Sequence, residues 1–513
     1  MSNRKKRALN GVLAGSFGSF LIQLVNIAVT PTYLNLTSQE LYGVWLTLAA
    51  LLGWIKIGDM GLGMALTRRS VKAWEDNDYS QLSRLAYGAM LSTFIFSIFV
   101  ASIAFFATDQ ILIFFNVTTI FEDEFRNTFT LLLIVAVLRP SMGVFSSLID
   151  SKQHIAYIGI RNTVLSLVVI GVTIILLYTN VGIISFAYAL LIEAFLIVIV
   201  DIIYLKNIDK NLTFFPIRTS KKDIYNLLNF GGPFQIIKLT NLVSTNIDNI
   251  LIASFIGFFA VPVYVFTGKL AFSFAIFVIG LVPSMLFPGI TQLFETNNLN
   301  KIRGVYLKLS NIAIRVGILT SLVYFAVNES FVKAWVGDEN FGGLDLTIIF
   351  VFWILLESYV RGITVIIYSS GKIKQLATIA SIESIINIIL TIFFIKYFDI
   401  KGAVLASVIC RLISVFYLPF SINKILNINS YSYLKNIIKE TIIYSIPLVI
   451  LVIIFFVFIF YTGTVLSLFD VIFISVCILF VNIFSYEGMY LLRLKGMPIR
   501  QRFNKLIKNY LSV

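Results

Sequence analysis

The feature that most constrains this sequence is a succession of apolar segments, each long enough to cross a bilayer as a helix. A spanning helix needs about 20 mostly apolar residues, because each residue advances the helix by about 1.5 Å. The segments that meet this requirement lie at about 8–30, 41–57, 85–107, 129–149, 160–178, 183–205, 230–254, 261–285, 307–327, 346–368, 375–397, 402–422, 440–462 and 469–492. With 58% hydrophobic and only 13% charged residues, the chain is not a water-soluble globule. It is predicted to be an all-α polytopic membrane protein with about fourteen transmembrane helices.

Basic residues gather in alternate loops. If the N-terminus with Arg4 and Lys5 is cytoplasmic, about 30 of the 40 Lys and Arg residues lie on that side. This group includes Arg68, Arg69, Lys72, Arg84, Lys152, Arg161 and the basic C-terminal tail. By the positive-inside rule, both termini of this multi-pass membrane protein are predicted to be cytoplasmic. The basic surplus matches an anionic inner leaflet and needs no nucleic-acid partner.

The seventh segment carries a polar stripe. Its polar residues are Lys238, Asn241, Thr245, Asp248 and Asn249. On a helix they fall within an arc of roughly 100°. A charged side chain inside a bilayer is costly unless it is paired or faces water. Two readings stay open: Lys238 and Asp248 are structural groups paired with neighbouring helices, or they line an internal cavity.

Other predicted helices repeat this pattern. In the first segment, one helix face carries Ser16, Ser19, Gln23, Asn26 and Thr30. The basic residues that lie inside predicted helices are Arg139, Lys238, Lys269, Arg315, Arg361 and Arg411. Fewer acidic residues lie inside the segments, chiefly Asp248, Glu357, Glu383, Glu193 and Asp201. Glu357 and Arg361 are spaced to pair on one helix. Each stripe can also be a packing contact between helices. Together they predict a polar, positively charged interior, which suits an anionic substrate.

An internal repeat with an offset of about 220 residues is also predicted. At this offset Trp74-Glu75-Asp76-Asn77 aligns with Phe294-Glu295-Thr296-Asn297, and Gly182 aligns with Gly402. Residues 1–225 and 226–425 are therefore predicted to form two six-helix lobes of the same topology. Residues 426–513 would add two helices and a basic tail.

Neither a metal nor a cofactor is expected. Cys410 and Cys477 lie inside apolar runs, and His154 is the only histidine. The segment Gly58-Asp59-Met60-Gly61-Leu62-Gly63 lacks the Lys-Ser/Thr of a phosphate-binding loop and is interpreted as a helix end entering a cytoplasmic loop.

Several short motifs follow one another along the chain. They are Pro31-Thr32-Tyr33-Leu34, Glu40-Leu41-Tyr42-Gly43-Val44-Trp45, Asp59-Met60-Gly61-Leu62-Gly63, Asn246-Ile247-Asp248, Phe287-Pro288 closing the eighth helix, and Ala334-Trp335-Val336-Gly337 in the following external loop. By their order and spacing, over nearly the whole chain, the sequence resembles the bacterial polysaccharide-export flippases. These proteins carry O-antigen, capsule or exopolysaccharide repeat units and are related to the multidrug and toxin extrusion (MATE) transporters of the MOP exporter superfamily.

The resemblance implies a MATE-like two-lobe (6+6) bundle that moves an undecaprenyl-diphosphate-linked oligosaccharide to the outer leaflet by alternating access, driven by an ion gradient. The expected partners are that glycan, membrane lipids and polysaccharide polymerase or assembly proteins. Lys238 and Arg315 are predicted to hold the diphosphate, since Arg and Lys suit phosphate. The remaining expected cavity residues are Arg139, Lys269, Arg361, Arg411, Asn241, Gln23 and Asn26. Asp248 or Glu357 would carry the coupling ion, H⁺ or Na⁺, because burial favours the neutral form of a carboxylate.

Two other functions remain open. A multidrug antiporter of the same fold would need a cavity dominated by carboxylates and aromatics to receive organic cations. The six intramembrane basic residues argue against such a cavity. A membrane glycan polymerase or ligase would need a sizeable external domain, whereas the longest external loops are about 108–128 and 328–345. The protein is therefore predicted not to be an enzyme.

We predict that Lys238→Ala abolishes glycan export without impairing membrane insertion, because loss of a charge makes insertion easier. Lys238→Arg should retain more activity than Lys238→Ala, since it keeps the positive charge. Export and membrane abundance of each variant, compared at normal expression, test this. Full export by Lys238→Ala would contradict the proposed role of Lys238 in substrate binding.

Overall fold

The computed structural model describes residues 3–55, 61–210, 224–225, 235, 239–240, 242, 246–275, 279, 281–439 and 441–442. The predicted helices 440–462 and 469–492, together with Lys238 and Asn241, lie outside these residues, apart from positions 441 and 442.

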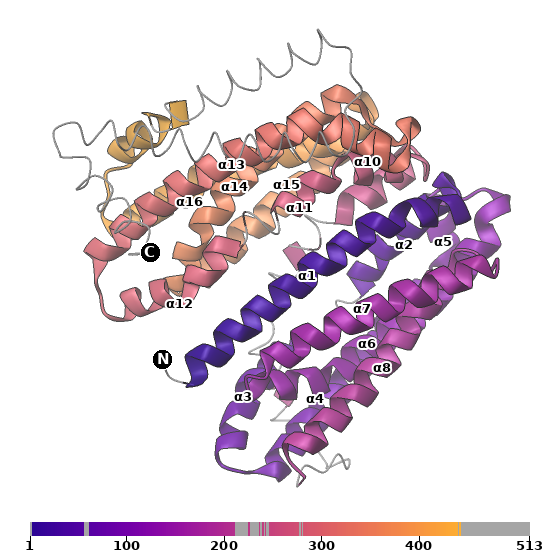
Figure 1. The fold of residues 1–513 in the computed structure, drawn as a ribbon, viewed down its shortest axis with the longest axis horizontal. Coiled ribbons are helices and arrows are strands. Elements are labelled where there is room, and N and C mark those ends of the chain that lie inside the picture. The colour runs from indigo at the N-terminus through magenta and orange to yellow at the C-terminus, as the bar shows by residue number, and fades with distance from the viewer. Residues whose placement is uncertain are drawn as a thin grey trace. The chain divides into compact units, whose positions relative to one another are not determined.

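The described residues form helices joined by short turns (Figure 1). Their bounds are α1 Asn3–Leu36, α2 Gln39–Ile55, α3 Leu62–Glu75, α4 Tyr79–Phe106, α5 Thr108–Phe114, α6 Thr119–Ser151, α7 Ile155–Tyr178, α8 Ile184–Ile208, α10 Ala260–Thr267, α11 Lys269–Phe274, α12 Leu281–Glu295, α13 Leu299–Val336, η3 Asp338–Asn340, α14 Gly343–Ser369, α15 Ile373–Phe398 and α16 Ile400–Leu426. Residues 246–255 and 430–439 are also helical. Within this part of the chain, nine helices are long and apolar enough to cross a membrane.

Some helix boundaries differ from the sequence prediction. The predicted cytoplasmic loop after the second segment contains α3, because Leu62, Leu66 and the residues around them give this basic stretch an apolar face that packs on its neighbours. In the eighth segment α10 ends at Thr267, just before Gly268, where α11 follows, and α12 begins at Leu281. The helix there does not close at Phe287-Pro288, since α12 continues to Glu295. Likewise Ala334 to Val336 belong to the last turn of α13, and only Gly337 lies beyond it.

The chain divides into two compact units. Unit 1 comprises Met1–Lys269, Glu339–Ile349 and Gly371–Ser414, and unit 2 comprises Leu270–Asp338, Phe350–Ser370 and Val415–Val513. The predicted lobe boundaries at 225 and 425 stay a prediction. In unit 1, α1 packs along α7, α6 packs against α4 and α8, and α3 lies against both α4 and α6 (Figure 1). In unit 2, α12 packs against α13.

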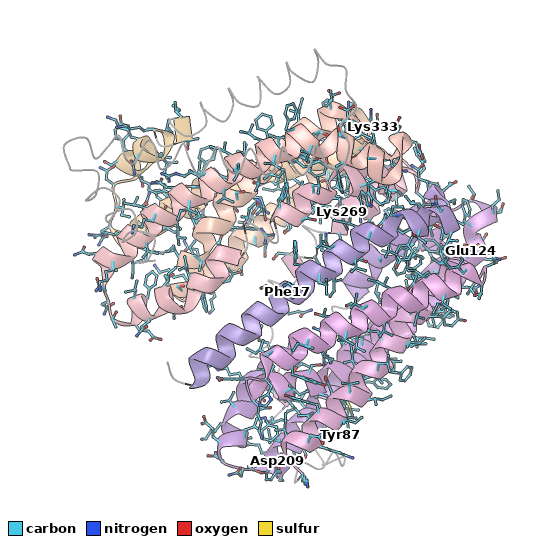
Figure 2. All side chains as sticks on the ribbon, in the orientation of Figure 1. Phe17, Tyr87, Glu124, Asp209, Lys269 and Lys333 are labelled. Carbon is cyan, nitrogen blue, oxygen red and sulfur yellow. The ribbon has the colours of Figure 1, made fainter. Side chains whose placement is uncertain are left out.

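One end of unit 1 is held by a hydrophobic core. Leu62, Leu66 and Trp74 of α3 pack with Leu82 and Leu85 of α4 in a cluster that also includes residues of α6 and α8. The opposite ends of the long helices are marked by Glu124 on α6 and Asp209 just after α8 (Figure 2). Basic α3 therefore lies at the Asp209 end, because Lys152 contacts both Asp209 and Trp74.

Close helix contacts depend on glycine at one position in α2. A Cβ atom at Gly43 would lie 1.9 Å from the carbonyl oxygen of Phe258, so only glycine permits this approach. Beside it, Gln39 donates a hydrogen bond to the carbonyl of Phe259 at 3.1 Å. The rings of Tyr42 and Phe266 stack with centroids 5.9 Å apart. These contacts fix the start of α10 against α2 within unit 1.

Helix ends at the predicted repeat offset share one turn geometry. Asn77 after α3 and Asn297 after α12 both have positive φ, 53° and 50°, which asparagine tolerates better than most residues. The next residue then caps the following helix: the Asp78 carboxylate accepts from the Gln81 amide at 2.8 Å, and the Asn298 side chain accepts from the Lys301 amide at 3.3 Å. Asn116, Asn180 and Asn427 also have positive φ, so this geometry is common to several turns, and the repeat stays a prediction.

Exposed apolar side chains cover the outer surfaces of the long helices. On α4, Ile95, Phe99, Ile103 and Phe106 recur at helical spacing and are all exposed. Phe17 of α1 is likewise exposed (Figure 2). Exposing such apolar stripes to water would cost free energy, whereas the hydrocarbon of a bilayer can surround them without this cost.

Candidate functional site

Asp248 is the central group of a polar layer inside unit 1. It belongs to the helical residues 246–255, and only 6% of its surface is exposed. The hydroxyl of Tyr264 on α10 donates a hydrogen bond to its Oδ2 atom at 2.7 Å. Among the described residues, its Oδ1 atom has no hydrogen-bond partner. Asp248 is therefore a desolvated carboxylate with one oxygen available to a proton or a cation.

Helix α2 packs against the helix that carries Asp248. A Cβ atom at Gly53 would lie 3.2 Å from the Nδ2 atom of Asn246, two residues before Asp248. Because two residues on a helix are about 200° apart, this contact lies on the face away from Asp248. The sequence motif Asn246-Ile247-Asp248 thus lies at a packed helix contact.

Helices α15 and α16 extend the polar layer. On α15, Glu383 accepts a hydrogen bond from Ser414 at 2.6 Å and forms an ion pair with Arg411 at 3.3 Å. One turn further, Asn387 donates to Ser407 at 3.1 Å. Ser407, Arg411 and Ser414 recur at helical spacing and therefore share one face of α16. In the structure this stripe binds α16 to α15.

A second link joins α15 to the seventh segment. The Ser384 hydroxyl donates to the carbonyl of Thr240 at 3.3 Å. Thr240, Glu383 and Asp248 are all buried. The seventh segment and α15 therefore share a buried polar interface in unit 1.

Arg139 and Arg361 are also in ion pairs. Arg139 of α6 lies 3.1 Å from Glu193 of α8. Arg361 pairs with Glu357 on α14, as their spacing predicted. Three of the six predicted intramembrane cations, Arg139, Arg361 and Arg411, therefore face carboxylates among the described residues.

A buried network at the α6–α7–α8 contact was not predicted. The Arg161 guanidinium pairs with Asp201, and both side chains are almost fully buried. Ser146 donates to Asp201 at 2.7 Å, and Tyr157 donates to it at 3.2 Å. Arg161 was counted among the basic residues of the cytoplasmic side, which stays a prediction, and the structure places it buried within α7. The signal in the sequence was Asp201, an isolated carboxylate in an apolar run.

The remaining predicted site residues are distributed over several helices. Gln23 and Asn26 are partly buried on α1, and Lys269 begins α11, all in unit 1. Arg315 is partly buried on α13 in unit 2. Their roles, and those of Lys238 and Asn241, stay predictions.

The sequence and the fold can now be compared with known proteins. A family model described as "Polysaccharide biosynthesis protein" matches residues 9–294 of the 513-residue chain. The chain belongs to this family. No curated protein sequence matches it. The predicted resemblance to polysaccharide-export flippases is confirmed.

Solved structures are similar to the chain over most of its length. The lipid II flippase MurJ, in an inward closed conformation, has 14% identity and a TM-score of 0.73, covering 94% of this chain and 100% of MurJ. An inward-facing multidrug resistance MATE family transporter of the MOP superfamily has 13% identity and a TM-score of 0.62, covering 79% and 98%. The Vibrio cholerae MATE transporter VcmN, as a D35N mutant, has 15% identity and a TM-score of 0.56, covering 84% and 100%. The predicted all-α, MATE-like membrane fold is confirmed.

We expect Arg161→Met to destabilise the protein by about 3–5 kcal/mol, because it leaves the buried Asp201 carboxylate without its cation. The double variant Arg161→Met/Asp201→Leu should recover most of this loss, since both charges are removed together. Unfolding temperatures of the purified protein in detergent measure both effects.

The exposed pair of Arg126 and Asp109, 2.8 Å apart, is the matched control. Arg126 also pairs with Glu122 at 3.0 Å, and Arg126→Met should change the unfolding temperature little, because water solvates both carboxylates that remain. Equal losses for Arg161→Met and Arg126→Met would contradict a structural role for the buried pair.

Proposed function

We propose that this protein is a flippase for undecaprenyl-diphosphate-linked oligosaccharide repeat units, which it moves from the cytoplasmic to the outer leaflet by alternating access. The observation that carries the proposal is the polysaccharide biosynthesis family match on a chain with a transporter fold. The family supplies the connection to glycans, and the fold supplies a route across the membrane. We propose no catalytic role.

Physical chemistry explains why this substrate needs a protein with buried polar groups. A diphosphate and sugar hydroxyls lose their hydration in hydrocarbon, at a cost of several kcal/mol for each polar group that finds no partner. Guanidinium and ammonium groups can replace that hydration, while the polyprenyl tail stays in the bilayer.

Arg361 illustrates how a paired arginine can still bind a substrate. Its Nε atom bonds the Glu357 carboxylate, which is buried. The Arg361 side chain itself is 43% exposed. Glu357 therefore orients the guanidinium, and its terminal nitrogens are left to meet a phosphate. We propose the same use of Lys238, Arg315, Lys269, Arg139 and Arg411, with Asn241, Gln23 and Asn26 contacting sugars.

Ion coupling is proposed to act through Asp248, with Glu357 as the second candidate. Asp248 has one oxygen bonded to Tyr264 and the other without a described hydrogen-bond partner. Glu357 is instead neutralised by Arg361 on the same helix. No cation among the described residues is recorded in an ion pair with Asp248, and a carboxylate without such a partner gains more from binding H⁺ or Na⁺ in a desolvated place. Asp248 therefore fits the coupling role better.

We further propose that the protein lies in the bacterial cytoplasmic (inner) membrane with both termini inside. Its products would be O-antigen, capsule or exopolysaccharide, made together with polymerase or assembly proteins.

The test is the leaflet distribution of lipid-linked oligosaccharide in cells with and without the protein, read with an impermeant glycan-modifying enzyme added from outside. We expect loss of the protein to trap the glycan on the cytoplasmic face. If the glycan reaches the outer leaflet but stays unpolymerised, a polymerase or ligase function replaces the flippase. If glycan processing is normal, a multidrug antiporter becomes the function to test.

We predict that Asp248→Asn abolishes the stimulation of glycan translocation by an imposed H⁺ or Na⁺ gradient, because an amide of the same size cannot bind either ion as a carboxylate does. Proteoliposomes with and without the gradient measure this. The control is Asp345→Asn, since Asp345 is 73% exposed and pairs with Lys401. Gradient stimulation should persist in this control. Undiminished stimulation in Asp248→Asn would shift the coupling role to Glu357.

A further inference from the structure

We propose that a cavity between α3 and α4 binds the phosphate head group of an anionic membrane lipid. The cavity has a volume of about 430 Å³ and is lined by Arg68, Arg69, Lys72, Gln81 and Leu85. Three of these five lining residues are cationic and none is acidic. This site lies apart from the polar layer around Asp248 and does not depend on the flippase proposal.

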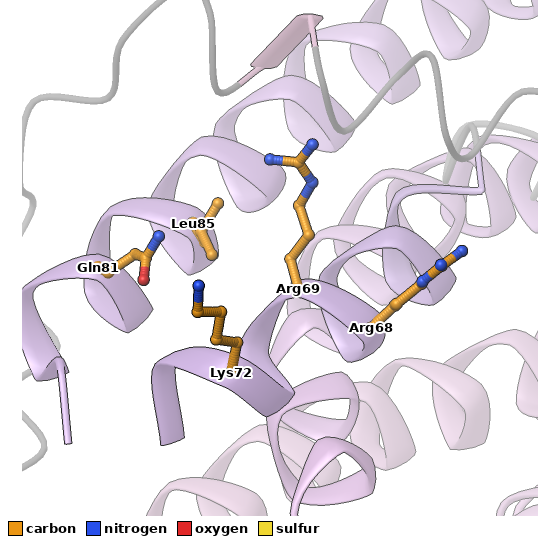
Figure 3. Close-up of a pocket in the computed structure, with 5 residues that line it drawn as sticks. All are labelled: Arg68, Arg69, Lys72, Gln81 and Leu85. Carbon is orange, nitrogen blue, oxygen red and sulfur yellow. The ribbon is translucent and has the colours of Figure 1, made fainter. Parts of the chain in front are cut away.

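Helical spacing places the three cations on one side of α3. On α3, Arg68, Arg69 and Lys72 fall within an arc of about 100°. On α4, Gln81 and Leu85 are one turn apart and therefore share a face. Lys72 and Gln81 point toward one another across the space between the helices, and Arg69 extends beside them (Figure 3). An ammonium, a guanidinium and an amide thus surround a volume large enough for a phosphodiester.

The cavity walls are rigidly held. Trp74 of α3 donates to the Ser151 hydroxyl at 2.8 Å, and its ring lies under the Lys152 ammonium at 3.9 Å. Thr67 donates to the carbonyl of Ser147 at 3.3 Å. These contacts fasten α3 to the end of α6. The site is therefore formed before a ligand arrives, which lowers the entropic cost of binding.

The neighbouring surface favours a lipid over a soluble phosphate. Met64 and Val71 lie on the same face of α3 as Arg68 and are exposed. A helix that exposes apolar and basic side chains together is typical of a membrane–water interface, where acyl chains meet head groups. Helix α3 therefore carries both side chains that can donate hydrogen bonds to a phosphate and apolar side chains that can contact acyl chains.

The second half of the chain indicates that the fold does not require these cations. At the repeat offset of about 220 residues, Arg68, Arg69 and Lys72 correspond to Pro288, Gly289 and Gln292. The turns that follow the two helices nevertheless have the same geometry, at Asn77 and Asn297. The basic residues are thus a property of the first half, as expected for a binding site rather than a structural need.

The test uses the full-length protein in a neutral detergent, titrated with phosphatidylglycerol and, separately, phosphatidylcholine. We expect saturable binding of phosphatidylglycerol and much weaker binding of phosphatidylcholine. Arg69→Gln/Lys72→Gln should weaken phosphatidylglycerol binding about thirty-fold, because each basic residue near an anionic head group contributes about one kcal/mol. The control Lys435→Gln/Lys439→Gln removes the same charge from the exposed surface of the helical residues 430–439 and should leave affinity within about two-fold.

Two further measurements separate the site from general electrostatic attraction. Gln81→Trp fills the cavity without changing charge, and Gln81 is exposed, so folding should be preserved. Its binding should fall at least ten-fold. Equal losses in both charge variants, or unchanged binding in Gln81→Trp, would overturn the site. Displacement of the lipid by inorganic phosphate at an equal concentration would overturn the assignment to a lipid.

Discussion

The structure depends on one constraint, the absence of water around charged groups inside a bilayer. Within the described spans, Arg139, Arg361 and Arg411 each face a carboxylate, and Arg161 is enclosed with Asp201. Each pair joins two helices or two turns of one helix. Charge neutralisation and helix packing are thus achieved by the same contacts.

Asp248 departs from this pattern. Among the described residues its partner is the neutral hydroxyl of Tyr264, whereas Glu193 and Asp201 each face an arginine. Groups held in such surroundings respond most strongly to a proton or a cation. Glu193 and Asp201, which pair with arginines, are therefore structural charges, whereas Asp248 is the candidate coupling group.

The ends of the helices follow different rules, because water and lipid head groups replace hydrocarbon there. Basic α3 packs one face in the hydrophobic core and presents the other to a cavity. Hydropathy could not find this helix, since its cations lower the mean over any spanning window. Its amphipathic spacing was visible in the sequence, but a basic loop and a basic helix have the same composition. Packing against α4 and α6 decides between them.

The sequence by itself determined the membrane class, the family resemblance and most helix positions, because apolar length and motif order are local properties of the chain. It also predicted the Glu357–Arg361 pair, since both residues lie on one helix. Only the tertiary structure decided that Arg411 faces Glu383 and that Arg161 faces Asp201. Such partners lie on different helices, and their contact depends on how the helices rotate and pack. That arrangement is set by many contacts at once, so no single stretch of sequence records it.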